Sequence, residues 1–216
     1  MIRKHSFFGP ARFGEARRGY HHGSLKDALI EAARALIAEH GPAGFTLAEA
    51  AKLVCVTAAA PYRHFTDRGD LIGELARRGF EIFGERLAIA WDEGRPDARA
   101  AFKRMGRAYL AFAAAEPGLY AAMFNDVKQL RRPASWAAAD KAFDGLGRAA
   151  AAVLAGTNVS PDDIRRLAFE IWALSHGTAM LALAGHFDRE RGDESAAILE
   201  QGVEALIDQA LKRAHA

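Results

Sequence analysis

The chain is poor in cysteine, in long apolar runs and in the alternation of apolar and polar residues that marks β-strands. Its single cysteine, Cys55, permits no internal disulfide and provides no ligand spacing for a metal. Charge or glycine interrupts each apolar run before the roughly 20 residues that a bilayer span needs, and the N-terminus lacks the continuous apolar core of a signal peptide. These absences predict a protein of the reducing cytoplasm with no membrane partner, no metal and no cofactor.

What is abundant is helix-forming sequence. Half of the 216 residues are hydrophobic, and alanine dominates several stretches. Because alanine has the highest helix propensity, we expect an all-α fold without a sheet. The net charge of +2 is too small to indicate a class of partner.

The segment Thr46–Phe65, TLAEAAKLVCVTAAAPYRHF, has the pattern of two short helices joined by a tight turn. Thr46 and Glu49 form a capping box, in which each side chain accepts from the other residue's amide, so a helix should begin at Leu47. Apolar residues then recur at i, i+3, i+4 and i+7. These residues are Leu47, Ala50, Ala51 and Val54.

A second short helix is expected from Thr57, whose hydroxyl can serve as its N-cap. Pro61 removes an amide and crowds the Thr57 carbonyl, but this costs only the first intrahelical bond, so the helix should survive with a tightened first turn. The preceding segment carries an apolar stripe from Leu25 to Ile37, which Ser24 should cap and Gly41 should end. The result is a three-helix unit with helix-turn-helix organisation.

This unit has the side chains that DNA recognition needs. Small residues from Thr57 to Ala60 let a helix approach base edges closely, and alanine methyls can contact thymine methyls. Hydroxyl, guanidinium and imidazole groups follow at once and can donate to phosphates, and Arg68 lies near the start of a fourth helix running to about Trp91. The predicted DNA-contacting residues of this unit are Thr46, Thr57, Ala58, Ala59, Tyr62, Arg63, His64 and Arg68.

A basic arm precedes the unit, with five basic residues and one acidic residue, a net +4, over residues 1–24. Residues 1–15 are expected to be a solvated tail. Arg17 and Arg18 lie just before the first helix, where they either stay solvated or contact DNA phosphates. The adjacent His21 and His22 lack a third ligand nearby and make a poor metal site.

Residues 20–72 resemble the DNA-binding domain of the TetR family of transcriptional regulators, most specifically in the ending Tyr62-Arg63-His64-Phe65. The run Trp172–Gly177 resembles, more weakly, the Trp-His-Gly signature of one subgroup of TetR ligand domains. The resemblance implies operator DNA, a small effector and dimerisation. By position it gives phosphate contacts to Tyr62, His64 and Arg68, and groove contacts to Thr57, Ala58 and Ala59.

Two departures from the family pattern bear on how DNA is recognised. Cys55 stands in the turn where many members have glycine, and the alanine-rich second helix lacks long polar side chains that contact bases. We therefore expect sequence selection through backbone approach, thymine methyls, DNA shape and the Arg17-Arg18 arm.

The expected domains are a flexible basic arm at 1–19, a helix-turn-helix domain at 20–69 and an effector-binding and dimerisation domain at 70–216. Breaks near Pro96, Pro117, Pro133 and Pro161 divide the last domain into six helices. They are expected at about 70–92, 97–115, 117–125, 134–155, 161–186 and 193–214. Lysine plus arginine balance aspartate plus glutamate here, so composition does not indicate a second nucleic-acid surface.

The helices near 161–186 and 193–214 are the candidates for a dimer interface. The first is apolar around most of its circumference and needs cover on two sides, whereas the second carries one apolar stripe. A second copy of the chain would supply that cover as a four-helix interface, and the alternative is that both helices fill the monomer core.

Aromatic and methionine side chains on the other helices can line a pocket for a hydrophobic or aromatic effector. The alternative for each is a place in the plain core. His176 is the strongest candidate, because a histidine amid an apolar helix must find a polar partner. The expected pocket residues are Phe102, Met105, Tyr109, Phe112, Tyr120, Met123, Phe124, Trp136, Phe143, Trp172, His176 and Met180.

Taken together, the residues favour a homodimeric, ligand-responsive DNA-binding regulator, a repressor that a small effector releases from DNA by shifting the fourth helix. A helical interaction module without DNA binding is the first alternative. An all-helical enzyme is the second, although the sequence shows no nucleophile-base pair, paired inward carboxylates, metal-ligand spacing or phosphate loop to support one.

Overall fold

The computed structural model describes residues 25–124, 133–187 and 193–214, and this part of the chain is helical without strands. The expected contributions of Arg17, Arg18 and the Ser24 cap lie outside the described residues. The helices are α1 (Leu25–His40), α2 (Leu47–Leu53), α3 (Arg68–Trp91), α4 (Ala98–Ala115), α5 (Pro117–Phe124), α7 (Pro133–Val153), α8 (Pro161–Leu183) and α9 (Glu194–Ala214), with 3-10 turns η1 (Ala60–Arg63) and η2 (Asp92–Gly94). The all-α prediction is confirmed.

The N-terminal unit begins as its caps predict. The Thr46 amide donates to the Glu49 carboxylate at 2.7 Å, and the Glu49 amide donates to the Thr46 hydroxyl at 3.2 Å. Helix α2 therefore starts at Leu47. Helix α1 gives way at Gly41, whose φ of 75° lies in the left-handed region that favours glycine at a helix end.

The expected second helix of the motif is wrong in type and length. Instead of an α-helix from Thr57, the structure has the single 3-10 turn η1, preceded by Ala59 without a side-chain cap. Pro61 is the physical cause, since it has no amide to give the Thr57 carbonyl four residues back. That carbonyl accepts from the Ala60 amide at 3.0 Å instead, which tightens the turn.

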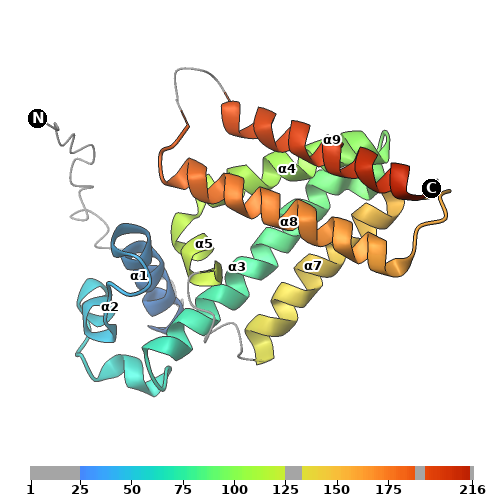
Figure 1. Ribbon diagram of the computed structural model, residues 1–216. Helices are drawn as coiled ribbons and strands as arrows, with labels where there is room; N and C mark the ends of the chain where they lie inside the picture. The colour runs from blue at the N-terminus through green and yellow to red at the C-terminus, as the bar shows by residue number, and fades with distance from the viewer. Residues whose placement is uncertain (1–24, 125–132, 188–192, 215–216) are drawn as a thin grey trace, which may run out of the picture.

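Helix α3 connects the small N-terminal unit to the rest of the molecule, as Figure 1 shows. The Asp67 side chain caps it by accepting from the Asp70 amide at 2.7 Å. Its 24 residues give a length of about 36 Å at the usual rise per residue. One face of α3 thus serves the core of the N-terminal unit through Leu71 and Ile72, and its middle serves the larger unit.

The six helices α3, α4, α5, α7, α8 and α9 make the larger unit, each within three residues of its expected bounds. Helices α8 and α9 lie side by side over α4, and α7 packs against α3 and α8 (Figure 1). The short α5 packs against both α1 and α3. Among the described residues, no helix combines the length and the apolar character that crossing a membrane requires.

Candidate DNA interface and ligand pocket

The turn around η1 presents its side chains outward. Thr57, Ala58 and Ala59 are exposed, as are Arg63 and His64. Tyr62 leaves 62% of its surface free, which is unusual for so large an aromatic side chain, whereas its neighbours Pro61 and Phe65 are buried and anchor the turn. The fold therefore brings the predicted groove-facing residues and three phosphate-type donors onto one exposed turn.

Two of the residues predicted to contact DNA also stabilise the fold. The Thr46 hydroxyl donates to Glu49 at 2.9 Å, so its proton is engaged within the capping box. The Arg68 guanidinium lies over the Phe45 ring at 5.2 Å, and its Nε atom is buried with no hydrogen-bond partner among the described residues. Arg68 thus helps to hold α3 against the N-terminal unit, which the sequence pattern does not reveal.

The backbone conformation at Cys55 explains why glycine is favoured at this position of the turn. It is exposed, and its φ of 58° places it in the left-handed region just after α2 ends. A residue with a β-carbon is strained there, while glycine is not. The Val56 amide reaches back to the Ala51 carbonyl at 3.0 Å and closes the helix end.

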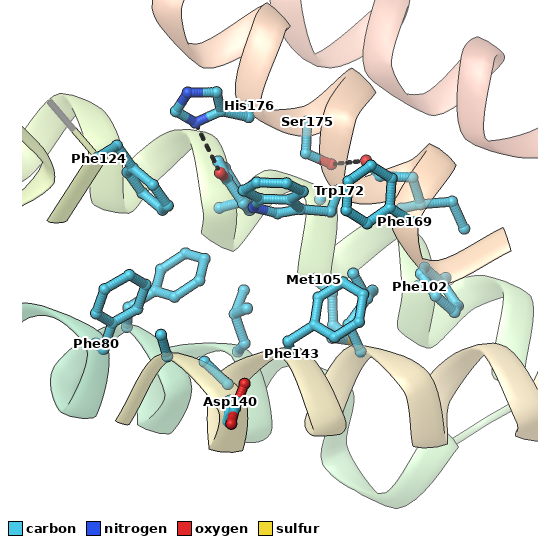
Figure 2. A pocket seen from close by; sticks show the side chains of 18 of the residues that line it. Phe80, Phe102, Met105, Phe124, Asp140, Phe143, Phe169, Trp172, Ser175 and His176 are labelled. Atoms are coloured by element: carbon cyan, nitrogen blue, oxygen red, sulfur yellow. Dashed lines mark hydrogen bonds between the residues drawn. The ribbon is translucent and has the colours of Figure 1, made fainter. Parts of the chain in front are cut away.

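The larger unit has a cavity of about 420 Å³ between α3, α4, α5, α7 and α8, with Val203 of α9 also in its lining, and this volume is within the size range of drug-sized ligand sites. Its walls are mostly aromatic. Figure 2 shows Phe124, His176 and Phe80 of α3 toward one end, Trp172 in the middle of the view, and Phe143 of α7 across from Trp172. Trp136 and Phe169 are more than half exposed, so this part of the lining opens toward solvent between α7 and α8.

Eight of the expected pocket residues line this cavity and four do not. The lining ones are Phe102, Met105, Tyr109, Phe124, Trp136, Phe143, Trp172 and His176. Phe112 and Met123 are fully buried in the core, Tyr120 is buried behind the lining, and Met180 is exposed on α8.

The sequence prediction missed the α3 wall, made by Phe80, Phe83 and Leu87, and missed Phe169 of α8. The α3 residues recur at i, i+3 and i+7, a spacing that could have indicated a shared face. Phe169 carries no such signal, because α8 is apolar around most of its circumference.

A chain of three polar side chains lies at one end of the pocket. The Tyr120 hydroxyl is 2.8 Å from His176 Nδ1, and the Tyr109 hydroxyl is 3.2 Å from that of Tyr120. Burial lowers the pKa of His176 and raises the pKa of Tyr120 to about 12, and burial likewise raises the pKa of Tyr109. All three groups are therefore uncharged at neutral pH.

Helix α5 joins this pocket to the N-terminal unit. Tyr120 in the middle of α5 and Phe124 at its end contact His176, while Gly118, near its start, packs on the backbone of α1. Just before α5, Glu116 pairs with Arg34 of α1 at 2.7 Å and with Arg86 of α3 at 3.2 Å. The α1 helix is thus held by contacts from the element that also closes the pocket.

A helix-turn-helix unit with an exposed basic turn, joined by one long helix to a helical unit with an apolar pocket, defines a DNA-binding regulator with a ligand domain. Two family models fit the chain in that order. Residues 29–75 match the model described as bacterial regulatory proteins, tetR family, and residues 102–206 match the tetracyclin repressor-like C-terminal domain. Together these matches span more than half of the chain, which belongs to the TetR family of transcriptional regulators.

Solved structures show the same fold over most of the chain. A Rhodococcus sp. RHA1 protein of unknown function is 29% identical, with a TM-score of 0.74, 90% of this chain covered and 99% of the other. A tetR-family regulatory protein from Rhodococcus RHA1 is 18% identical, with a TM-score of 0.68 and coverages of 88% and 98%. The fatty acid degradation regulator FadR from Bacillus halodurans is 17% identical, also at 0.68, with coverages of 86% and 96%. No curated protein sequence matches the chain.

Proposed function

We propose that this regulator is a homodimeric repressor that binds operator DNA through α2 and the turn around η1, and that a small hydrophobic or aromatic effector releases it. The observation that carries the proposal is that α3 is shared: its first turn is anchored beside the DNA-facing turn, and its middle is a wall of the pocket. The proposed domain limits are 1–19, 20–69 and 70–216. We also propose, from the run Trp172–Gly177, that the chain belongs to the TetR subgroup whose ligand domain carries a Trp-His-Gly signature.

On DNA, the proposed contacts divide by chemistry. Tyr62, Arg63 and His64 donate to phosphates and fix the register, whereas Ala58 and Ala59 allow the backbone to approach base edges. Arg68 contributes charge near the phosphates while remaining stacked on Phe45.

The proposed dimer forms through α8 and α9. The end of α8 exposes Met180, Leu181 and Leu183, and α9 exposes Ile198. Gly177 of α8 has open space where a β-carbon would be, so a partner helix can approach its backbone closely. Two copies related by a two-fold axis would cover these faces and place the DNA-facing turns about 34–36 Å apart, one turn of B-DNA.

The proposed release of the repressor from DNA depends on contacts that α3 and α5 make with both the pocket and α1. A ligand in the pocket touches α3 through Phe80 and Phe83, and meets α5 through Phe124. Helix α3 holds α1 through Arg78 with Asp27 at 2.5 Å, and Glu116, directly before α5, holds α1 through Arg34. A ligand that fits only a shifted position of α3 and α5 therefore shifts the population away from the DNA-binding arrangement.

A gel-shift titration against the promoter region of the protein's own operon tests the proposal. We expect a salt-sensitive complex with a palindromic site. Arg63→Gln should weaken it and make the dependence of log affinity on log salt shallower by about one unit, because one phosphate is no longer neutralised. Arg148→Gln, which removes an exposed charge on α7, is the matched control and should change neither quantity.

The absence of any complex with such a site would refute DNA regulation and favour the alternative, a helical interaction module. Tyr62→Phe distinguishes the two further. Because Tyr62 is exposed, removing its hydroxyl should lower DNA affinity without lowering the melting temperature. A loss of stability with unchanged affinity would instead indicate that the turn serves packing.

A further inference from the structure

The charge of the pocket limits what it can bind. Among its described lining residues, the charged ones are Asp140 and Arg165, and both are exposed at the rim on α7 and α8. They have opposite signs, so they do not favour a ligand charge of either kind. An ionised group inside would lose its hydration without gaining a counter-charge, which costs several kcal/mol. The interior is therefore suited to an uncharged ligand.

The shape of the walls favours a flat ligand. The Trp172 and His176 rings are nearly parallel, at 27°, while Phe143 meets Phe169 and Trp172 edge to face. Ring faces and ring edges thus both border the cavity, as Figure 2 shows for Trp172, Phe143 and Phe169. A planar aromatic ring can stack on the faces and receive the edges in the offset and T-shaped arrangements that aromatic groups prefer.

The hydrogen-bonded chain of side chains at the polar end of the pocket ends at Tyr109. Of the three residues in the chain, Tyr109 and His176 line the cavity, whereas Tyr120 is buried between them. Ser175 also lines the cavity, but its hydroxyl donates to the carbonyl of Ile171 on its own helix at 2.8 Å. The Tyr109 hydroxyl also lies 3.5 Å from His176 Nδ1 and has a side-chain hydrogen bond with Trp172. Because a phenol has one proton and two lone pairs, Tyr109 keeps one hydrogen-bonding position for a ligand.

The histidine tautomer sets what Tyr109 offers. If Nδ1 of His176 accepts from Tyr120, then Tyr120 accepts from Tyr109, and the Tyr109 oxygen, which also accepts from the Trp172 indole N–H, has one lone pair left for a ligand. If Nδ1 carries the proton, both hydroxyls turn around and Tyr109 donates to the ligand instead. The chain can thus satisfy a ligand hydroxyl or a ligand carbonyl without creating a charge.

We infer that the effector is an uncharged, flat aromatic molecule carrying one hydroxyl or carbonyl group, and that Tyr109 binds this group with Tyr120 and His176 behind it. The inference rests on the proposed role of this cavity as the effector site. It adds the chemical class of the ligand and the residue that selects its polar group.

A series of two-ring probes tests it by isothermal titration calorimetry on the full chain. The probes are biphenyl, 4-phenylphenol, 4-acetylbiphenyl, biphenyl-4-carboxylate and biphenyl-4-trimethylammonium. One net hydrogen bond corresponds to about a two- to tenfold gain in affinity, so 4-phenylphenol and 4-acetylbiphenyl should bind tighter than biphenyl by about that factor. The two charged probes should bind more weakly than biphenyl.

Tyr109→Phe removes only the hydroxyl that the inference uses. It should abolish the advantage of 4-phenylphenol and leave biphenyl unchanged. Ser175→Ala is the matched control, because it deletes a lining hydroxyl that is already bonded to its own helix, and it should keep the advantage.

Three results would overturn the inference: a charged probe binding as tightly as 4-phenylphenol, an advantage that persists in Tyr109→Phe, or no binding by any probe. The gel-shift assay on the same preparation separates these from failure of the proposed function. Retained DNA binding with any of these results would refute the ligand class alone, whereas loss of DNA binding by the unmodified chain would refute the regulator.

Discussion

Gly118 offers the sharpest test of how the two units are joined. A β-carbon at this position would lie 2.2 Å from the Arg34 carbonyl oxygen of α1. An ordinary carbon-to-oxygen contact is about 3.3–3.6 Å, so Gly118→Ala must push α5 and α1 apart by about 1 Å. The obstacle is backbone and cannot rotate away, and overpacking of this kind costs about 1–3 kcal/mol.

The substitution also brings a gain, because alanine is favoured over glycine in a helix by up to about 1 kcal/mol. Gly147→Ala on α7 isolates that gain, since nothing lies within 4 Å of a β-carbon there. The propensity term is similar in both variants, so the difference between them reports the clash. In a chain of this length, a clash of about 1–3 kcal/mol lowers the melting temperature of Gly118→Ala by about 2–12 °C relative to that of Gly147→Ala.

Differential scanning calorimetry of the two variants, followed by gel-shift titration, measures both consequences. Gly118→Ala should melt below Gly147→Ala and bind operator DNA more weakly, because α1 carries α2 and the turn around η1 with it. If Gly118→Ala melts at or above Gly147→Ala, the close packing of α5 on α1 is not as described, and the coupling argued from it fails.

Local features of the chain give three further predictions. Thr46→Ala should lower the free energy of unfolding by about 0.5–2 kcal/mol because the capping box is removed, and Thr46→Ser should retain most of it; equal losses in urea titrations would contradict the cap. The hydrogen bond from Arg77 lowers the pKa of Glu74 to about 2 from about 4.5, so its stabilisation is complete above pH 4.5 and is lost as pH falls toward 2. The stability gap between wild type and Glu74→Gln should therefore narrow over that range, and a constant gap would show that ionisation is irrelevant. Gly177→Leu should shift the protein toward monomer in sedimentation velocity while Gly177→Ala does not, and an intact dimer in both would exclude α8 from the interface.

The helix layout could be predicted well from local signals. Capping residues such as Thr46 and breaks at prolines act over three or four residues, so they can be recognised without knowing the tertiary structure. The type of helix is harder to predict. Pro61 disturbs the first turn in any case, but whether the chain recovers α geometry afterwards depends on how Pro61 and Phe65 are buried against the rest of the unit.

The pocket was only partly predictable, for a related reason. An aromatic residue on an apolar face can fill the core or border a cavity, and the sequence periodicity is the same in both cases. Phe112 and Met123 proved to be core, while Phe80 and Phe83 of α3 proved to line the cavity. What separates them is the fit between neighbouring helices, which arises from contacts between segments far apart in the chain.

The small size of the turn around η1 bears on how this protein can change its DNA target. Two of its three predicted groove-facing positions, Ala58 and Ala59, hold alanine, whose side chain cannot hydrogen-bond to a base. Neither Ala58 nor Ala59 contributes buried surface to the core, which means that replacement is not opposed by folding stability. In the proposed DNA complex, operator specificity is therefore open to change by single substitutions, since a longer polar side chain at either position can reach a base edge that alanine cannot hydrogen-bond.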